Sequence, residues 1–129
     1  MANALAESVG ETVSRLVMAD DPQIPVPELQ VPIEIDLDGT TTVFGDFGWR
    51  DANGVLRLVG EFDGRIKYHR SNPWDDSMPE ETIYEEKLRE DAIRATGPSL
   101  VRWTWTESMH PKVLQLKIIG ALTAAGLIS

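Results

Sequence analysis

Residues 44–68 read FGDFGWRDANGVLRLVGEFDGRIKY, and this segment decides the fold of the chain. Two short runs suited to β-strands, FGDFGW at 44–49 and LRLVGEFD at 56–63, flank the turn sequence DANG at 51–54. An Asn-Gly pair between apolar runs is typical of a β-hairpin, because both of its residues tolerate the positive φ angles of a tight turn. The segment therefore predicts two antiparallel strands joined by this turn.

Acidic side chains gather at the far end of the predicted hairpin. Successive side chains of a strand point to opposite faces, so Glu61 and Asp63 share one face. Asp46 on the first strand is expected to project near them, and Lys67 follows soon after the second strand. Clustered carboxylates repel one another and lose hydration unless a cation or a proton compensates them. The cluster therefore indicates a functional site, with a divalent metal as the simplest counter-charge.

Composition limits the classes of protein to consider. The chain has 129 residues, which favours a single domain over residues 1–129, and its 42% hydrophobic and 26% charged residues are typical of a globular protein. It has no cysteine, which excludes disulfides, thiolate metal sites and a cysteine nucleophile. The formal net charge of -9 argues against a protein that coats nucleic acid. It is compatible with a metal-dependent nuclease, because bound Mg²⁺ offsets several carboxylates.

The sequence shows no sign of a membrane or export segment. No apolar run reaches the roughly 20 residues that a membrane-spanning helix needs. The first residues lack a basic segment followed by an apolar core, the pattern of a signal peptide. We therefore expect a cytoplasmic protein without a membrane partner.

The elements on either side of the hairpin follow from apolar periodicity. Residues 1–20 are predicted to form an N-terminal helix, which three prolines between residues 22 and 27 bring to an end. The hairpin belongs to a three-strand meander over 30–68, whose first strand is expected at the sheet edge because it contains Pro32. Further along, the predicted elements are a crossover helix at 79–97, a fourth strand at 99–106 and a C-terminal helix at 110–127.

The crossover implies that the third and fourth strands lie parallel. Most of the charge on the crossover helix reads as surface electrostatics, because Glu85 with Arg89 and Glu90 with Arg94 are favourable i,i+4 pairs. The two tryptophans of the fourth strand are expected in the core rather than on a surface that stacks bases. The predicted order is α-β-β-β-α-β-α, an α/β sandwich around a four-stranded mixed sheet.

This order resembles the PD-(D/E)xK restriction-endonuclease-like superfamily. More narrowly, the motifs EFDGRIKY, YEEKLREDAIRATG and LVRWTW resemble the very-short-patch-repair-like nuclease domains of actinobacteria and their phages. Such domains often form the C-terminal part of AbiEi-type antitoxin proteins. The resemblance covers about residues 7–125 and implies a restriction-endonuclease-like fold and a metal-dependent nuclease that hydrolyses DNA, in phage or host defence or in DNA repair.

The resemblance also implies catalytic roles for individual residues. Asp46 is the metal-binding aspartate of the fold, and Glu61 is the first acid of the (D/E)xK pair. Asp63 stands where that motif normally has its lysine, which is a departure from the family pattern. Lys67, or Lys87 from the crossover helix, would then replace this lysine.

A metal and a phosphate site follow from the same resemblance. The implied ligands of Mg²⁺ or Mn²⁺ are Glu11 of the first helix, Asp46, Glu61 and Asp63. The implied phosphate contacts are Arg65, His69 and Arg102. For Arg102 an ion pair with Glu90 or Asp91 is the alternative, and His69 is also a candidate proton shuttle.

A second interpretation keeps the fold and removes the catalysis. Without the usual lysine, the chain would be an inactive nuclease-fold module of the antitoxin or regulator type that binds DNA or a protein partner. Its acidity suits a protein partner better than bare DNA, and a homodimer is a further possibility. Such a module should tolerate Glu61→Ala, with a gain in stability from lower carboxylate repulsion.

Overall fold

One mixed β-sheet organises the molecule, with its strands in the order β1-β2-β3-β4. The computed structural model describes residues 4–64 and 80–129. Along this part of the chain the elements are α1 (Ala4–Ala19), β1 (Glu28–Asp36), β2 (Thr40–Arg50), β3 (Leu56–Asp63), α2 (Glu80–Ala95), β4 (Ser99–Thr104), α3 (Trp105–Ser108) and α4 (Pro111–Ala124). The predicted α/β class and four-stranded mixed sheet are confirmed, and the short helix α3 is an addition to the predicted order.

The hairpin of β2 and β3 forms as predicted, but its turn differs in detail. The Gly54 N–H donates to the Asp51 carbonyl at 3.0 Å, and the Asp51 carboxylate accepts from the N–H groups of Asn53 and Val55. Gly54 has a φ angle of 81°, whereas Asn53 keeps a negative φ. The Asp51 side chain caps the turn, and of Asn53 and Gly54 only Gly54 enters the left-handed region.

The strand pairing confirms the predicted crossover and edge. β3 pairs in parallel with β4, from Leu58 opposite Ser99 to Asp63 opposite Thr104, and α2 connects the two strands. β1 pairs only with β2 and therefore lies at the sheet edge. Pro32, which has no N–H to donate, lies on this edge strand.

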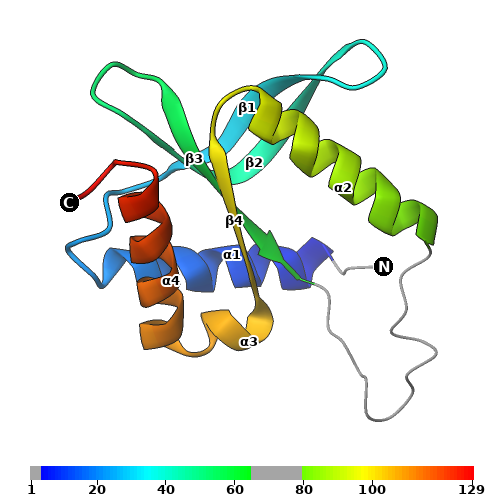
Figure 1. Cartoon of the computed structure of the whole chain (residues 1–129). Helices are drawn as coiled ribbons and strands as arrows, with labels where there is room; N and C mark the ends of the chain where they lie inside the picture. The colour runs from blue at the N-terminus through cyan, green and yellow to red at the C-terminus, as the bar shows by residue number, and fades with distance from the viewer. Residues whose placement is uncertain (1–3, 65–79) are drawn as a thin grey trace.

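Each face of the sheet packs against its own helices (Figure 1). On the side of α1 and α4, Phe47 and Trp103 are buried with their ring centroids 5.5 Å apart, and the Trp103 indole N–H donates to the buried Ser14 hydroxyl at 2.9 Å. On the side of α2, Val59 and Ile93 are fully buried in a second cluster. Trp103 therefore belongs to the core, as predicted.

The fourth strand is shorter than predicted. β4 ends at Thr104, not at residue 106, because Thr104 is the N-cap of α3. The Glu107 N–H donates to the Thr104 hydroxyl, and the Thr104 N–H donates to the Glu107 carboxylate at 3.0 Å, which is a capping box. This reciprocal pair turns the chain out of the sheet and carries Trp105 into the helix.

The other element boundaries differ from prediction by a few residues. α4 ends at Ala124 rather than 127, because the Leu127 N–H donates back to the Leu122 carbonyl at 2.9 Å and Gly126 takes a φ angle of 76°. This is the helix-ending arrangement that glycine favours. β1 begins at Glu28 rather than at residue 30.

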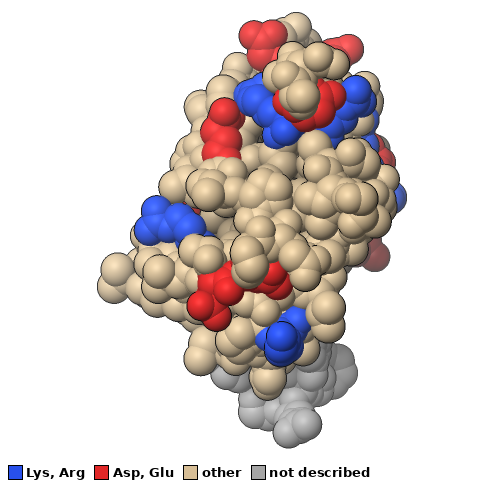
Figure 2. Space-filling view, turned by 90° about the vertical axis from the view of Figure 1, so that its left-hand side faces the viewer, with Lys and Arg blue, Asp and Glu red and all other residues tan. Residues whose placement is uncertain are grey.

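The surface carries charge in small groups. On the face drawn in Figure 2, Lys and Arg side chains lie in separate groups, with uncharged residues and groups of Asp and Glu between them. Arg50 pairs with Glu28 at 3.2 Å and Arg57 pairs with Asp51 at 2.9 Å, both near the β2–β3 turn. Among the described helices none is long and apolar enough to cross a membrane.

Candidate functional site

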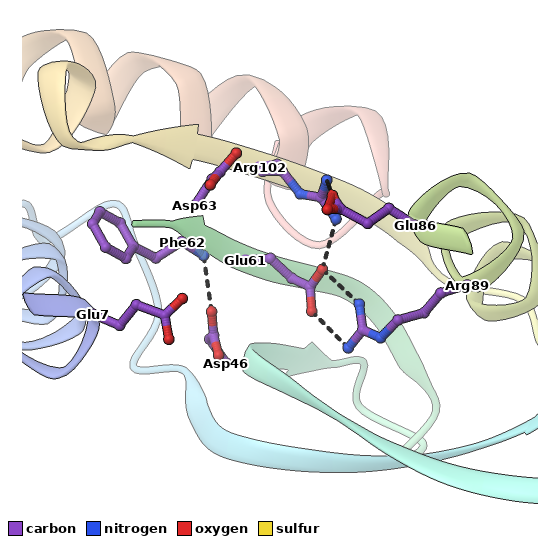
Figure 3. A pocket seen from close by; sticks show the side chains of 8 residues that line it. All are labelled: Glu7, Asp46, Glu61, Phe62, Asp63, Glu86, Arg89 and Arg102. Carbon is purple, nitrogen blue, oxygen red and sulfur yellow. Dashed lines mark hydrogen bonds and ion pairs between the residues drawn. The ribbon is translucent and has the colours of Figure 1, made fainter. Parts of the chain in front are cut away.

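A pocket of about 280 Å³ lies where the middle of β2 and the C-terminal end of β3 meet α1, α2 and β4 (Figure 3). Charged side chains dominate its lining. The residues that line it are Glu7, Asp46, Glu61, Phe62, Asp63, Glu86, Arg89 and Arg102. Five carboxylates therefore face two guanidinium groups in one space.

Strand pairing brings the acids of the hairpin together. Phe47 lies opposite Gly60 in the antiparallel register, so the residue before Phe47 and the residue after Gly60 are neighbours across the pair. The Asp46 carboxylate accepts a hydrogen bond from the Phe62 N–H at 2.9 Å, which fixes Asp46 against β3. Glu61 lies directly opposite Arg102 in the parallel register of β3 and β4.

Two glycines allow α1 to bring Glu7 into the pocket. Gly10 lies so close to the Phe62 ring that a Cβ atom at this position would overlap the ring. A Cβ atom at Gly64 would lie 2.6 Å from Cγ of Glu7. The helix can therefore approach the end of β3 closely only because neither position has a side chain.

Glu61 is the most enclosed acid of the pocket, with 7% of its surface exposed. Arg89 of α2 donates from both terminal nitrogens to the two Glu61 oxygens, each at 3.0 Å. Arg102 of β4 donates to Glu61 Oε1 at 3.1 Å. Each arginine has a second partner, since Arg89 also donates to the Phe44 carbonyl at 3.1 Å and Arg102 lies 3.6 Å from Glu86. The negative charge of Glu61 is thus compensated within the protein.

Asp46 has no such compensation. Burial raises the pKa of Asp46, and the charges of Glu61 and Glu7 raise it further, although the Phe62 N–H and Arg89 act in the opposite direction. Burial likewise raises the pKa of Glu11 on α1, and the charges of Asp46 and Glu7 add to the effect. These carboxylates have negative charge that their surroundings do not balance.

Some predicted site residues meet in the pocket and others do not. Asp46, Glu61, Asp63 and Arg102 all line it. Arg102 contacts Glu61 and Glu86 rather than the expected Glu90 or Asp91.

The structure corrects the expected positions of two further residues. Glu11 lies outside the pocket, in a smaller cavity of about 120 Å³ that Asp46 also lines. Lys87 is exposed on α2 and does not line the pocket. Arg89, two residues further along α2, points into the pocket instead. Lys67, Arg65 and His69 lie outside the described residues.

Three charged residues that line the pocket were not predicted as site residues from the sequence. Glu7 lies one helical turn before Glu11 on the same side of α1, so the apolar pattern alone did not distinguish them. Arg89 had an apparent partner in Glu85, but it turns to the buried Glu61 instead. Glu86 follows Glu85 and lies beside Arg102. A buried carboxylate attracts a guanidinium group more strongly than an exposed one does, and this preference overrides the local pair.

The donor chemistry of the pocket fits a hard divalent cation, because its carboxylates offer oxygen ligands. In the geometry described for residues 4–64 and 80–129, no three His, Cys, Asp or Glu side chains are grouped so that they could hold a metal ion. Both oxygens of Glu61, the most enclosed of these acids, accept hydrogen bonds from arginines. Comparison with known protein families, with curated proteins and with solved structures finds no match to this chain.

Proposed function

We propose that the chain is a Mg²⁺- or Mn²⁺-dependent nuclease with a restriction-endonuclease-like fold that hydrolyses phosphodiester bonds in DNA. The observation that carries this proposal is the convergence of acids from α1, β2 and β3 on one pocket that also contains two arginines. The strand order with one parallel crossover supports the proposed fold. The mixture of acidic and basic groups suits a site in which a cation and a phosphate lie side by side.

The residues proposed to hold the metal are Asp46, Glu61 and Asp63, with Glu7 of α1 in the place expected for Glu11. A bound Mg²⁺ would supply an activated water and would stabilise charge on the phosphorus and the leaving oxygen. The raised pKa of Asp46 supports this assignment, because a cation would relieve the repulsion that raises it. Arg89 and Arg102 supply planar donor groups of the kind that bind phosphate in a bidentate way.

The second candidate is an inactive nuclease-fold module that binds DNA or a protein partner. Two observations favour it. Arginines already neutralise Glu61, and no lysine lines the pocket among the described residues. In that case the ion pairs at Glu61 would be a structural feature of the fold.

A thermal-melt titration with Mg²⁺ and Mn²⁺, followed by cleavage assays on labelled single- and double-stranded DNA, separates the two candidates. The informative variant is Asp46→Asn, which keeps an oxygen for the Phe62 N–H and removes the charge. The matched control is Asp36→Asn at the exposed end of β1. A nuclease should show a metal-dependent rise in Tm, and metal-dependent cleavage, in wild type and in Asp36→Asn but not in Asp46→Asn. Equal melting of all three proteins at millimolar metal, without cleavage, would support the inactive module.

A further inference from the structure

Glu61 is the pocket acid that both arginines of the lining contact. Both oxygens of Glu61 accept hydrogen bonds from Arg89, and one of them accepts a third from Arg102 (Figure 3). Charge-assisted and bidentate bonds of this kind are the strong ones among protein hydrogen bonds. A cation that uses Glu61 as a ligand therefore competes with two guanidinium groups.

We infer that Arg89 and Arg102 form an arginine clamp on Glu61 that must open before a divalent cation can bind there. The inference rests on the proposed function, since it concerns the regulation of the same site. The geometric basis of the inference is the set of three hydrogen bonds from Arg89 and Arg102 that occupy both Glu61 oxygens.

The partners of the two arginines show how the clamp can open. Besides Glu61, Arg89 has an acceptor in the Phe44 carbonyl at 3.1 Å, and Arg102 has Glu86 at 3.6 Å. Both guanidinium groups can therefore move aside without losing every partner, so that the open and closed arrangements need not differ greatly in energy. Burial lowers the pKa of Arg89, but its hydrogen bond to Glu61 and the surrounding acids outweigh this effect, so the guanidinium stays charged. The clamp therefore opens because another cation competes for Glu61, and not because Arg89 loses a proton.

Charge also sets the order of binding. Among the described residues that line the pocket, five carboxylates and two guanidinium groups give a formal charge of -3 when no ion is bound. A phosphodiester brings a further negative charge and meets arginines that are already engaged with Glu61. A divalent cation reduces the formal charge and releases the arginines. The clamp therefore predicts that the cation binds before the nucleic acid.

The test is the affinity of the full chain for Mn²⁺ alone, measured by calorimetry and by the paramagnetic signal of free Mn²⁺. Arg89→Gln should bind Mn²⁺ roughly ten-fold more tightly than wild type, because one charge-assisted pair is lost. Arg89→Lys keeps the charge but cannot form the bidentate pair, so its affinity should rise as well, by a smaller factor. Arg94→Gln is the matched control, because Arg94 lies on the same helix and pairs with Glu90 outside the pocket.

The outcomes distinguish the clamp from the proposed function. Tighter binding in both Arg89 variants, but not in Arg94→Gln, supports the clamp. Equal and measurable affinity in all four proteins overturns the clamp and leaves the metal site intact. An equal gain in Mn²⁺ affinity in Arg94→Gln and Arg89→Gln, with none in Arg89→Lys, would mean that affinity follows the net charge of the protein. This result also overturns the clamp. Absence of Mn²⁺ binding in every protein overturns both the clamp and the proposed metal site. Arg89→Lys keeps the test decisive if Arg89→Gln does not fold.

Discussion

Glu61 connects the stability of the fold with the chemistry of the pocket. Its replacement by Gln keeps the shape of the side chain but removes the carboxylate that Arg89 and Arg102, both partly buried, share, and leaves Arg102 only Glu86 at 3.6 Å. We expect Glu61→Gln to lower the free energy of unfolding by about 1.5–3 kcal/mol, as for the loss of hydrogen bonds between charged groups. Chemical denaturation of the metal-free protein measures this loss.

The exposed pair of Glu28 and Arg50 provides the control for Glu61→Gln. Glu28→Gln should change the free energy of unfolding by no more than about 0.5 kcal/mol, because exposed ion pairs contribute little. A Glu61→Gln variant as stable as wild type would show that the arginines do not depend on Glu61. The expectation from sequence that removal of this acid stabilises the protein is thus reversed, since the structure compensates Glu61 and not Asp46.

Replacement of Asp46 should stabilise the metal-free protein, whereas replacement of Glu61 should destabilise it. Its pKa is raised in the folded protein, first by burial and then by neighbouring acids, so the folded state holds the Asp46 proton more tightly than the unfolded state does. The resulting destabilisation is absent below the unfolded pKa of about 3.9 and grows as the pH rises through the folded pKa.

Asp46→Asn removes the Asp46 charge and should therefore be more stable than wild type at neutral pH in the presence of a chelator. The difference should shrink as the pH falls toward the unfolded pKa of about 3.9, which thermal melts over a series of pH values can follow. If the variant is less stable than wild type at every pH, the hydrogen bond from the Phe62 N–H outweighs the repulsion.

At the scale of single residues, the sequence predicts the acids of the hairpin well and their partners poorly. Alternation along a strand is local, and it placed Glu61 and Asp63 on one face near Asp46. The arginine partners come from α2 and β4, and their positions depend on how these elements pack. No local rule connects residue 61 with residue 89.

Among the elements, α1 depends most on a single glycine. A Cβ atom at Gly10 would overlap the Phe62 ring, whereas a Cβ atom at Gly120 of α4 would meet no other atom within 4 Å. We expect Gly10→Ala to lose stability, because overpacking of about 1–3 kcal/mol exceeds the roughly 1 kcal/mol gained in helix propensity. Gly120→Ala gains helix propensity without overpacking, so this variant should be more stable than wild type by up to about 1 kcal/mol.

Denaturation curves of these two alanine variants check this prediction. A stabilised Gly10→Ala would mean that Phe62 moves aside without strain. The same curves in the presence of Mn²⁺ would show whether the displacement of α1 also withdraws Glu7 from the pocket.

Some signals in the sequence are sufficient to predict how the strands pair, whereas others leave the end of an element uncertain by a few residues. Turn chemistry at 51–54 and the crossover helix predicted the pairing of all four strands correctly. The end of β4 was wrong by two residues, because the alternating pattern continues through Trp105 and Thr106 while the capping box of Thr104 and Glu107 begins a helix. The capping signal was present in the sequence, and the strand pattern concealed it.

The whole molecule is acidic, and this affects its stability independently of any single site. Helices cover both faces of the sheet around two clusters of buried residues, while the net charge of -9 remains largely at the surface. Self-repulsion of this size destabilises the compact state, and salt screens it over a Debye length that shortens from about 30 Å at 0.01 M to about 3 Å at 1 M.

We therefore expect added NaCl to stabilise the metal-free protein. A gain on the order of 1 kcal/mol between low and high salt corresponds to a rise in Tm of roughly 3–5 °C for a chain of this size. Choline chloride should have the same effect, because screening depends on ionic strength and not on the identity of the cation. A site-specific effect of Mg²⁺ should instead saturate at low concentration and disappear in Asp46→Asn. A Tm that falls with salt would mean that ion pairs such as those of Glu61 contribute more to stability than the net repulsion takes away.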